Sequence, residues 1–204
     1  MTLRENALGL IGAGGHGKVV AETAQASGWR EIGFFDPAFP QHRQHGVWPI
    51  LGAEPSDWTG ALFCAIGDNA TRARIFAERD LGDSPVLNHP SAILSPSARL
   101  GQGTLAVAGS IVNADAVIGR GVILNTACSV DHDCVLGDFV HVSPGARLAG
   151  NVHIGARSWI GIGAVVREGI RIGNDVMVGA GAAVVSDLPD GARVAGVPAR
   201  PLEG

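Results

Sequence analysis

The sequence predicts a chain of two unequal parts, a small Rossmann-like α/β domain followed by a parallel β-helix built from hexapeptides. Every sixth residue from 118 to 184 is isoleucine, leucine or valine. A strict period of six fits neither an α-helix nor an alternating strand, and it is typical of a hexapeptide β-helix. Upstream, a glycine-rich loop at 12–17 joins an apolar run to a helical stretch. The pattern changes at Asn88-His89-Pro90, which divides the chain into residues 1–89 and 90–204.

The first part is predicted to contain a βαβ unit, then a further strand and helix. Strands that alternate with helices predict a parallel sheet. The predicted strands cover residues 7–11, 31–35 and 61–66, and the predicted helices cover 18–27 and 71–81, the second capped by Asn69 or Thr71.

The second part is predicted to wind in coils of three hexapeptides, or about 18 residues each. From near Ile93 to Val185 it holds roughly five such coils. A second column, four residues after each lead residue, is small or apolar and is also expected to face the core. Pro189, Pro198 and Pro201 predict an irregular cap, which would protect the open edge of the last coil.

Composition excludes several classes of function. The 204 residues carry a formal charge of -4 with scattered arginines, which argues against nucleic-acid binding. No segment has the length of a membrane-spanning helix, and residues 1–10 lack the apolar stretch of a signal peptide. Cys64, Cys128 and Cys134 are predicted to be reduced core residues of a cytoplasmic protein.

The glycine-rich loop predicts a phosphate site. A strand, then Gly12-x-Gly14-x-x-Gly17, then a helix leaves backbone N–H groups free to face a phosphate. Asp36 ends the next strand, where it is placed to bind a ribose hydroxyl. The motif alone indicates NAD, but the domain is too short for two mononucleotide halves, so a single nucleotide fits better. The alternative is a tight turn that binds no ligand.

Three motifs carry a resemblance to a known family. They are Gly12-Ala13-Gly14-Gly15-His16-Gly17-Lys18-Val19-Val20, Ala65-Ile66-Gly67-Asp68-Asn69 and Ser91-Ala92-Ile93-Leu94-Ser95-Pro96-Ser97-Ala98. Over nearly its whole length the chain resembles the bacterial nucleotide-sugar N-acetyltransferases and sialic acid O-acetyltransferases. The resemblance implies that the small domain holds a nucleotide sugar, through Gly14, Gly15, His16, Asp36 and Gly67. Some members carry a second acidic residue where this chain has Pro37, so the identity of the nucleotide stays open.

The repeat carries a second resemblance. Residues 154–161 and the closing Gly196-Val197-Pro198-Ala199 are similar to the left-handed β-helix of hexapeptide-repeat acyltransferases. That resemblance implies a left-handed coil and a homotrimer with acyl-CoA in the groove between neighbouring prisms. It assigns acetyl-CoA contacts to His141, Ile162 and Ala180, and Gly150 joins them from its place one coil beyond His132.

His132 is the predicted catalytic base. It lies between Asp131 and Asp133 in an otherwise apolar repeat. A carboxylate that accepts a ring N–H fixes the tautomer and strengthens the other nitrogen as a base. Asp133 is the expected partner and Asp131 the fallback, while Gly150 is expected to offer its N–H group to the oxyanion. The alternative is a surface histidine at a coil corner.

The predicted function is therefore acetyl-CoA-dependent N-acetylation of an amino sugar linked to a nucleotide, with no metal. One alternative is an O-acetyltransferase for sialic acid or another sugar. A second is a zinc-dependent solenoid carbonic anhydrase, although His132, His141 and His153 fall in three different columns of the repeat. A third is a non-catalytic nucleotide sensor or assembly protein. His42, His45, His89 and His153 match no role and are expected at the surface or in loops.

Overall fold

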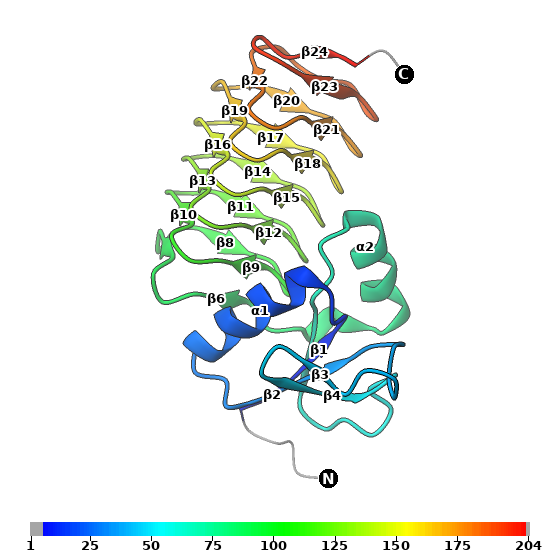
Figure 1. Ribbon diagram of the computed structural model, residues 1–204. Helices are drawn as coiled ribbons and strands as arrows, with labels where there is room; N and C mark the ends of the chain where they lie inside the picture. Colours follow the sequence, from blue (N-terminus) through cyan, green and yellow to red (C-terminus); the bar gives the residue numbers. More distant parts are fainter. Residues whose placement is uncertain (1–5, 203–204) are drawn as a thin grey trace.

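The structure, a computed structural model, describes residues 6–202 (Figure 1). It contains a small α/β domain and a long three-sided parallel β-helix. The predicted lack of a signal peptide falls partly on residues 1–5, which lie outside the described range.

The α/β domain is built on a five-stranded sheet of order β3-β4-β2-β1-β5. β1 pairs in parallel with β2 and β5, β4 pairs in parallel with β2, and only β3 is antiparallel to its neighbour. The elements are β1 Ala7–Ile11, α1 Gly15–Ala26, β2 Glu31–Phe35, β3 Gln44–His45, β4 Trp48–Gly52, β5 Ala61–Cys64, α2 Asn69–Glu78 and the 3₁₀ helix η1 Leu81–Asp83.

Two details of the predicted helices were wrong. α1 begins at Gly15, inside the glycine-rich loop, because Gly14 takes the extended N-cap position. α2 begins at Asn69 and is capped by Asp68, whose carboxylate accepts the N–H of Thr71 at 2.8 Å. The β3–β4 hairpin was not predicted, because a two-residue strand of polar residues has no periodicity to detect.

The β-helix has three faces, which we name by their first strands. The β6 face consists of β6 Leu87–Asn88, β9 Leu105–Ala106, β12 Ile123–Leu124, β15 His141–Val142, β18 Trp159–Ile160, β21 Met177–Val178, β23 Arg193–Ala195 and β24 Arg200–Pro201. The β7 face consists of β7 Ile93–Leu94, β10 Ile111–Val112, β13 Ser129–Val130, β16 Arg147–Leu148, β19 Val165–Val166 and β22 Ala183–Val184. The β8 face consists of β8 Arg99–Leu100, β11 Val117–Ile118, β14 Val135–Leu136, β17 His153–Ile154 and β20 Arg171–Ile172.

The hexapeptide columns form the core of this helix, as predicted. Paired strands are 18 residues apart, as in Val112 opposite Val130, so that equivalent side chains stack. The lead column and the second column are both buried, and Cys128 and Cys134 belong to that core. The last strand, β24, runs antiparallel to β23, so the proline-rich tail forms a short hairpin where an irregular cap was expected.

The two parts share a continuous interface. Val20 and Ala24 of α1 join Leu87 and Leu105 of the β6 face in one buried cluster, and Figure 1 shows α1 between the small sheet and the first coils. The division of the chain at residues 89 and 90 stays a prediction. β6 ends at Asn88, just before this division, and already pairs with β9 of the β-helix. The small domain is thus seated against the β6 face.

Candidate active site

His132 is hydrogen-bonded to Asp133 at a corner of the prism. It lies in the turn between β13 and β14, where the β7 face meets the β8 face. Its Nδ1 atom is 2.8 Å from Oδ2 of Asp133. The imidazole side chain is 59% exposed, so Nε2 is open to an incoming substrate. This hydrogen bond raises the pKa of His132 above its ordinary value, with the charges of Asp131 and Asp133 acting in the same direction.

Backbone conformation explains why the short side chain of Asp133 reaches the ring. Asp133 has φ of 58°, in the left-handed region that aspartate tolerates. Asp115 and Asn151, one coil before and one coil after, have φ of 58° as well, so this conformation belongs to the coil corner. Asp131 is occupied elsewhere, since its Oδ1 accepts from Asn113 Nδ2 at 2.9 Å and from the His132 N–H. Asp133, and not the fallback Asp131, contacts the imidazole.

Gly150 lies directly against this imidazole. A Cβ atom at position 150 would stand 2.5 Å from Cε1 and 2.6 Å from Nε2 of His132. The Cys134 thiol donates to the Ala149 carbonyl at 3.2 Å. Because the carbonyl and N–H of one peptide point in opposite directions, this contact turns the Gly150 N–H away from the core. Among residues 6–202 the Gly150 N–H donates to no other group, so it is available to an oxyanion.

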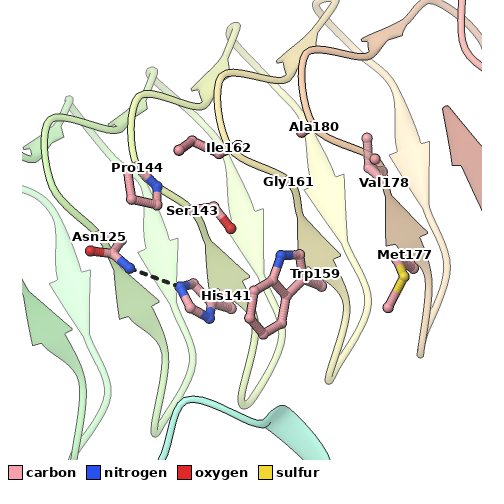
Figure 2. A pocket seen from close by; sticks show the side chains of 11 residues that line it. Asn125, His141, Ser143, Pro144, Trp159, Gly161, Ile162, Met177, Val178 and Ala180 are labelled. Atoms are coloured by element: carbon pink, nitrogen blue, oxygen red, sulfur yellow. Dashed lines mark hydrogen bonds between the residues drawn. The ribbon is translucent and has the colours of Figure 1, made fainter. Parts of the chain in front are cut away.

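The predicted acetyl-CoA contacts lie on a different side of the prism. His141 on β15, and Ile162 and Ala180 in the turns after β18 and β21, line a cavity of about 360 Å³ (Figure 2). Trp159 and Met177 give it an apolar wall, and Asn125 closes it near His141. Gly150 does not line this cavity. An elongated apolar groove with a few polar groups at one end suits a thioester with a long flexible arm.

His141 is a neutral, buried histidine. Burial lowers its pKa to about 3, and the charge of Arg72 acts in the same direction. Asn125 accepts the N–H of Thr126 through Oδ1, which leaves its Nδ2 group to donate to Nε2 of His141 at 3.1 Å. The proton of His141 is therefore on Nδ1. The ring packs against Trp159, with centroids 4.2 Å apart.

The glycine-rich loop meets the same region from the small domain. The His16 ring lies 6.2 Å from that of His141, and burial lowers its pKa to about 4. A Cβ at Gly14 or Gly15 would meet nothing within 4 Å, so the space beside both glycines is open. A Cβ at Gly17 would stand 2.8 Å from the Gly12 carbonyl, as expected where a helix packs closely on a strand. A Cβ at Gly67 would lie 3.7 Å from His16.

Asp36 stabilises the glycine-rich loop by accepting a backbone hydrogen bond from it. Its Oδ2 atom accepts the N–H of Ala13 at 2.8 Å, and its Oδ1 atom accepts the N–H of Ala38 at 2.9 Å. The carboxylate borders a second cavity of about 360 Å³, together with Gly12, Pro37 and Arg74. The cavity lies where β1 and β2 end, the usual place for a nucleotide in a parallel sheet. Its contact with a ribose stays a prediction.

Sequence reasoning missed the residues that join the two domains. Arg72 of α2 is 1% exposed and uses all five of its N–H groups. They donate to the carbonyls of Ile66, Gly67, Gly121 and Phe139 and to Oδ1 of Asn69. Asn69 in turn donates to the carbonyls of Arg157 and Ser158. No motif marks such a clamp, because four of its five acceptors are backbone carbonyls that no side chain identifies.

One chain does not bring all predicted site residues together. Gly14, Gly15, His16, Gly67 and His141 gather at the β6 face, whereas His132, Asp133 and Gly150 occupy the corner between the β7 and β8 faces.

The residues 6–202 contain no group of three metal-binding side chains, and no helix among them is long and apolar enough to cross a membrane. His45 was expected at the surface or in a loop; it ends the two-residue strand β3, is half-buried and contacts Gly14.

A prism of hexapeptide coils with a histidine–aspartate pair at its edge and an apolar groove along its flank defines an acyltransferase. The family models agree: residues 7–78 match the PglD N-terminal domain, and residues 151–185 match the bacterial transferase hexapeptide (six repeats).

Solved structures similar to this chain match it over nearly its whole length or all of it. The acetyltransferase domain of PglB from Neisseria gonorrhoeae FA1090, in complex with acetyl coenzyme A, is 45% identical with a TM-score of 0.91, covering 98% of this chain and 100% of that one. A histidine-to-asparagine variant of perosamine N-acetyltransferase from Caulobacter crescentus, in complex with CoA and GDP-perosamine, is 40% identical with a TM-score of 0.91 and full coverage of both chains.

A curated relative matches part of the chain. UDP-N-acetylbacillosamine N-acetyltransferase from Bacillus subtilis (strain 168) is 39% identical over 110 residues, which span 48% of this chain and 50% of that relative. Together these relatives show that the chain belongs to the nucleotide-sugar N-acetyltransferase family of hexapeptide-repeat acyltransferases.

Proposed function

We propose that the protein transfers the acetyl group of acetyl-CoA to the amine of a nucleotide-linked amino sugar, with His132 as the general base. The observation that carries this proposal is the His132–Asp133 pair with the bare backbone of Gly150 against its imidazole. The ring is oriented by a carboxylate, its Nε2 atom is free, and an unpaired N–H group lies beside it. Relatives that bind CoA and GDP-perosamine supply the two substrate classes.

The chemistry follows from this geometry. The amine attacks the thioester carbonyl, a C–N bond forms, and the Gly150 N–H donates to the oxyanion. His132 takes the proton that the amine loses, and Asp133 stabilises the resulting imidazolium. The C–S bond then breaks, and the imidazolium returns the proton to the thiolate of coenzyme A. Cys134 is unsuited to act as an acyl carrier, because it is buried and burial raises its thiol pKa.

The proposed site is completed by a second copy of the chain, within a homotrimer. His132 and the groove near His141 lie on different edges of one prism, so a neighbouring protomer is needed to place the thioester near the base. A closed cyclic assembly repeats such a contact at every interface.

Three free cysteines support a cytoplasmic location, where acetyl-CoA is made. The absence of nucleic-acid partners remains a prediction.

An acceptor panel tests this function. Purified protein with acetyl-CoA is assayed for thiol release with GDP-perosamine, a UDP-linked 4-amino sugar and sialic acid, and with His132→Ala as the matched variant. Turnover is expected with an amino nucleotide sugar and a loss of about 10²- to 10⁴-fold in kcat for the variant. Turnover with sialic acid alone would assign an O-acetyltransferase, and stoichiometric zinc with hydration of carbon dioxide would assign the anhydrase. Equal turnover by His132→Ala would remove this histidine from the mechanism.

A further inference from the structure

The β3–β4 hairpin contacts the glycine-rich loop through one histidine. His45 Nε2 lies 2.9 Å from the carbonyl oxygen of Gly14. A carbonyl only accepts hydrogen bonds, so Nε2 carries the hydrogen and donates it. The ring is held edge-on against the buried ring of Phe34, with centroids 5.1 Å apart and planes at 90°. His45 is therefore fixed by packing on one side and bonded to the loop on the other.

The same carbonyl has a second donor. The Gly17 N–H donates to the Gly14 carbonyl at 2.9 Å, at the first turn of α1. Because the C=O and N–H groups of a trans peptide point in opposite directions, two donors on this oxygen hold the Gly15 N–H on the opposite side. Among residues 6–202 the N–H groups of Gly14, Gly15 and His16 donate to no other group. They are the donors available to an anion at the start of α1.

The orientation of the peptide between Gly14 and Gly15 depends on these two hydrogen bonds. Neither residue has a Cβ, so both reach regions of φ and ψ that other residues avoid, and rotation of the peptide between them meets little steric resistance. Gly14, as the N-cap, has no side chain that caps the helix. The open space beside both glycines leaves no packing contact that would take over this task.

We propose that His45 is a positioning residue of the glycine-rich loop, which holds the Gly14 carbonyl so that the Gly15 N–H faces the diphosphate of the nucleotide sugar. The inference rests on the proposed function and deepens it. His45 does not itself contact the reacting atoms. Its effect therefore appears in nucleotide binding and in the KM for the nucleotide sugar, and not in the acetyl step.

Three variants isolate the donor. His45→Phe keeps a ring against Phe34 but removes the hydrogen bond, and His45→Gln keeps an N–H donor at the end of a side chain of similar reach. His42→Phe is the matched control, since His42 lies in the same segment and is exposed. Calorimetry measures the Kd for UDP and for GDP, thiol release measures kcat and both KM values, and circular dichroism checks that each variant is folded.

We expect His45→Phe to raise the nucleotide Kd and the KM for the nucleotide sugar about tenfold, the upper range for one hydrogen bond. Its kcat and its KM for acetyl-CoA stay at the wild-type values, His45→Gln restores binding to within about twofold, and His42→Phe changes nothing. Unchanged binding by a folded His45→Phe, or equal weakening in the Phe and Gln variants, overturns the inference alone. If the wild type bound neither nucleotide and released no thiol with any acceptor, the proposed function would fall first and this inference with it.

Discussion

Gly150→Ala is the sharpest test of the geometry around the base. The Cβ added at position 150 would lie 2.5 Å from Cε1 of His132, whereas carbon atoms in contact are about 3.5–4.0 Å apart. The imidazole must therefore move by about 1 Å or more. It is 59% exposed, so it can swing outward without disturbing the core. A displacement of that size at a reacting group costs about 10²-fold in rate, while the fold should lose little stability.

The assay is steady-state thiol release with a verified acceptor, together with thermal unfolding. Gly82→Ala is the matched control, because a Cβ there meets only the Asp80 carboxylate, at 3.9 Å. We expect kcat to fall about 10²-fold in Gly150→Ala and to stay unchanged in Gly82→Ala, with similar melting temperatures for both. Wild-type kcat in a folded Gly150→Ala protein would refute the idea that the chemistry takes place in the space between His132 and Gly150.

Three further predictions follow from the pKa of the base, the domain interface and the divided site. Wild-type kcat/KM should rise with pH through a value above the ordinary histidine pKa, because the base works when it is neutral. In Asp133→Asn the rising part of this pH profile moves to lower pH and the maximum of kcat/KM falls, because the carboxylate that raises the pKa of His132 is gone. A pH profile that does not move would contradict the pairing of His132 with Asp133. Arg72→Met leaves five acceptors in the domain interface without their donor, so we expect denaturant unfolding to show a loss of about 3–5 kcal/mol. Arg74→Met, in the exposed Arg74–Glu78 pair of the same helix, should lose less than about 0.5 kcal/mol, and equal losses would argue against the clamp. Co-expressed His132→Ala chains, which lack the base, and His141→Ala chains, which lack a predicted acetyl-CoA contact, should regain full activity at about a quarter of the sites. Mixed oligomers no more active than the single variants would place both histidines in one chain's site.

The sequence predicted the β-helix well because its signal is redundant. Each coil repeats the same requirement, a branched aliphatic residue at one place and a small or apolar one four residues later, and the buried lead column from Val112 to Val184 follows it without a gap. The βαβ unit was equally accessible, because Gly17 is needed for the packing of α1 on Phe34. Element boundaries were less accurate where a cap decides them, as at Asp68, because a capping carboxylate and a solvated one look alike in a sequence.

The candidate site was predictable only where it follows the repeat. Residues 132 and 150 stack because they are one coil apart, and the structure places Gly150 against the imidazole as that spacing requires. Asn125, Arg72 and His45 act through backbone carbonyls or through other side chains, so their residue types carried no signal.

The period of six also places residues around the prism, and this explains why the site is divided. His132 and His141 are nine residues apart, which is half a coil, so they fall on opposite sides of the same turn of chain. A rigid prism cannot fold such residues toward each other, because its core is filled by the hexapeptide columns. The proposed base on one edge and the proposed thioester groove on another would therefore meet only when two prisms lie side by side. In this fold the assembly is thus expected to be part of the catalytic apparatus, and dilution to monomers should abolish turnover while leaving each chain folded.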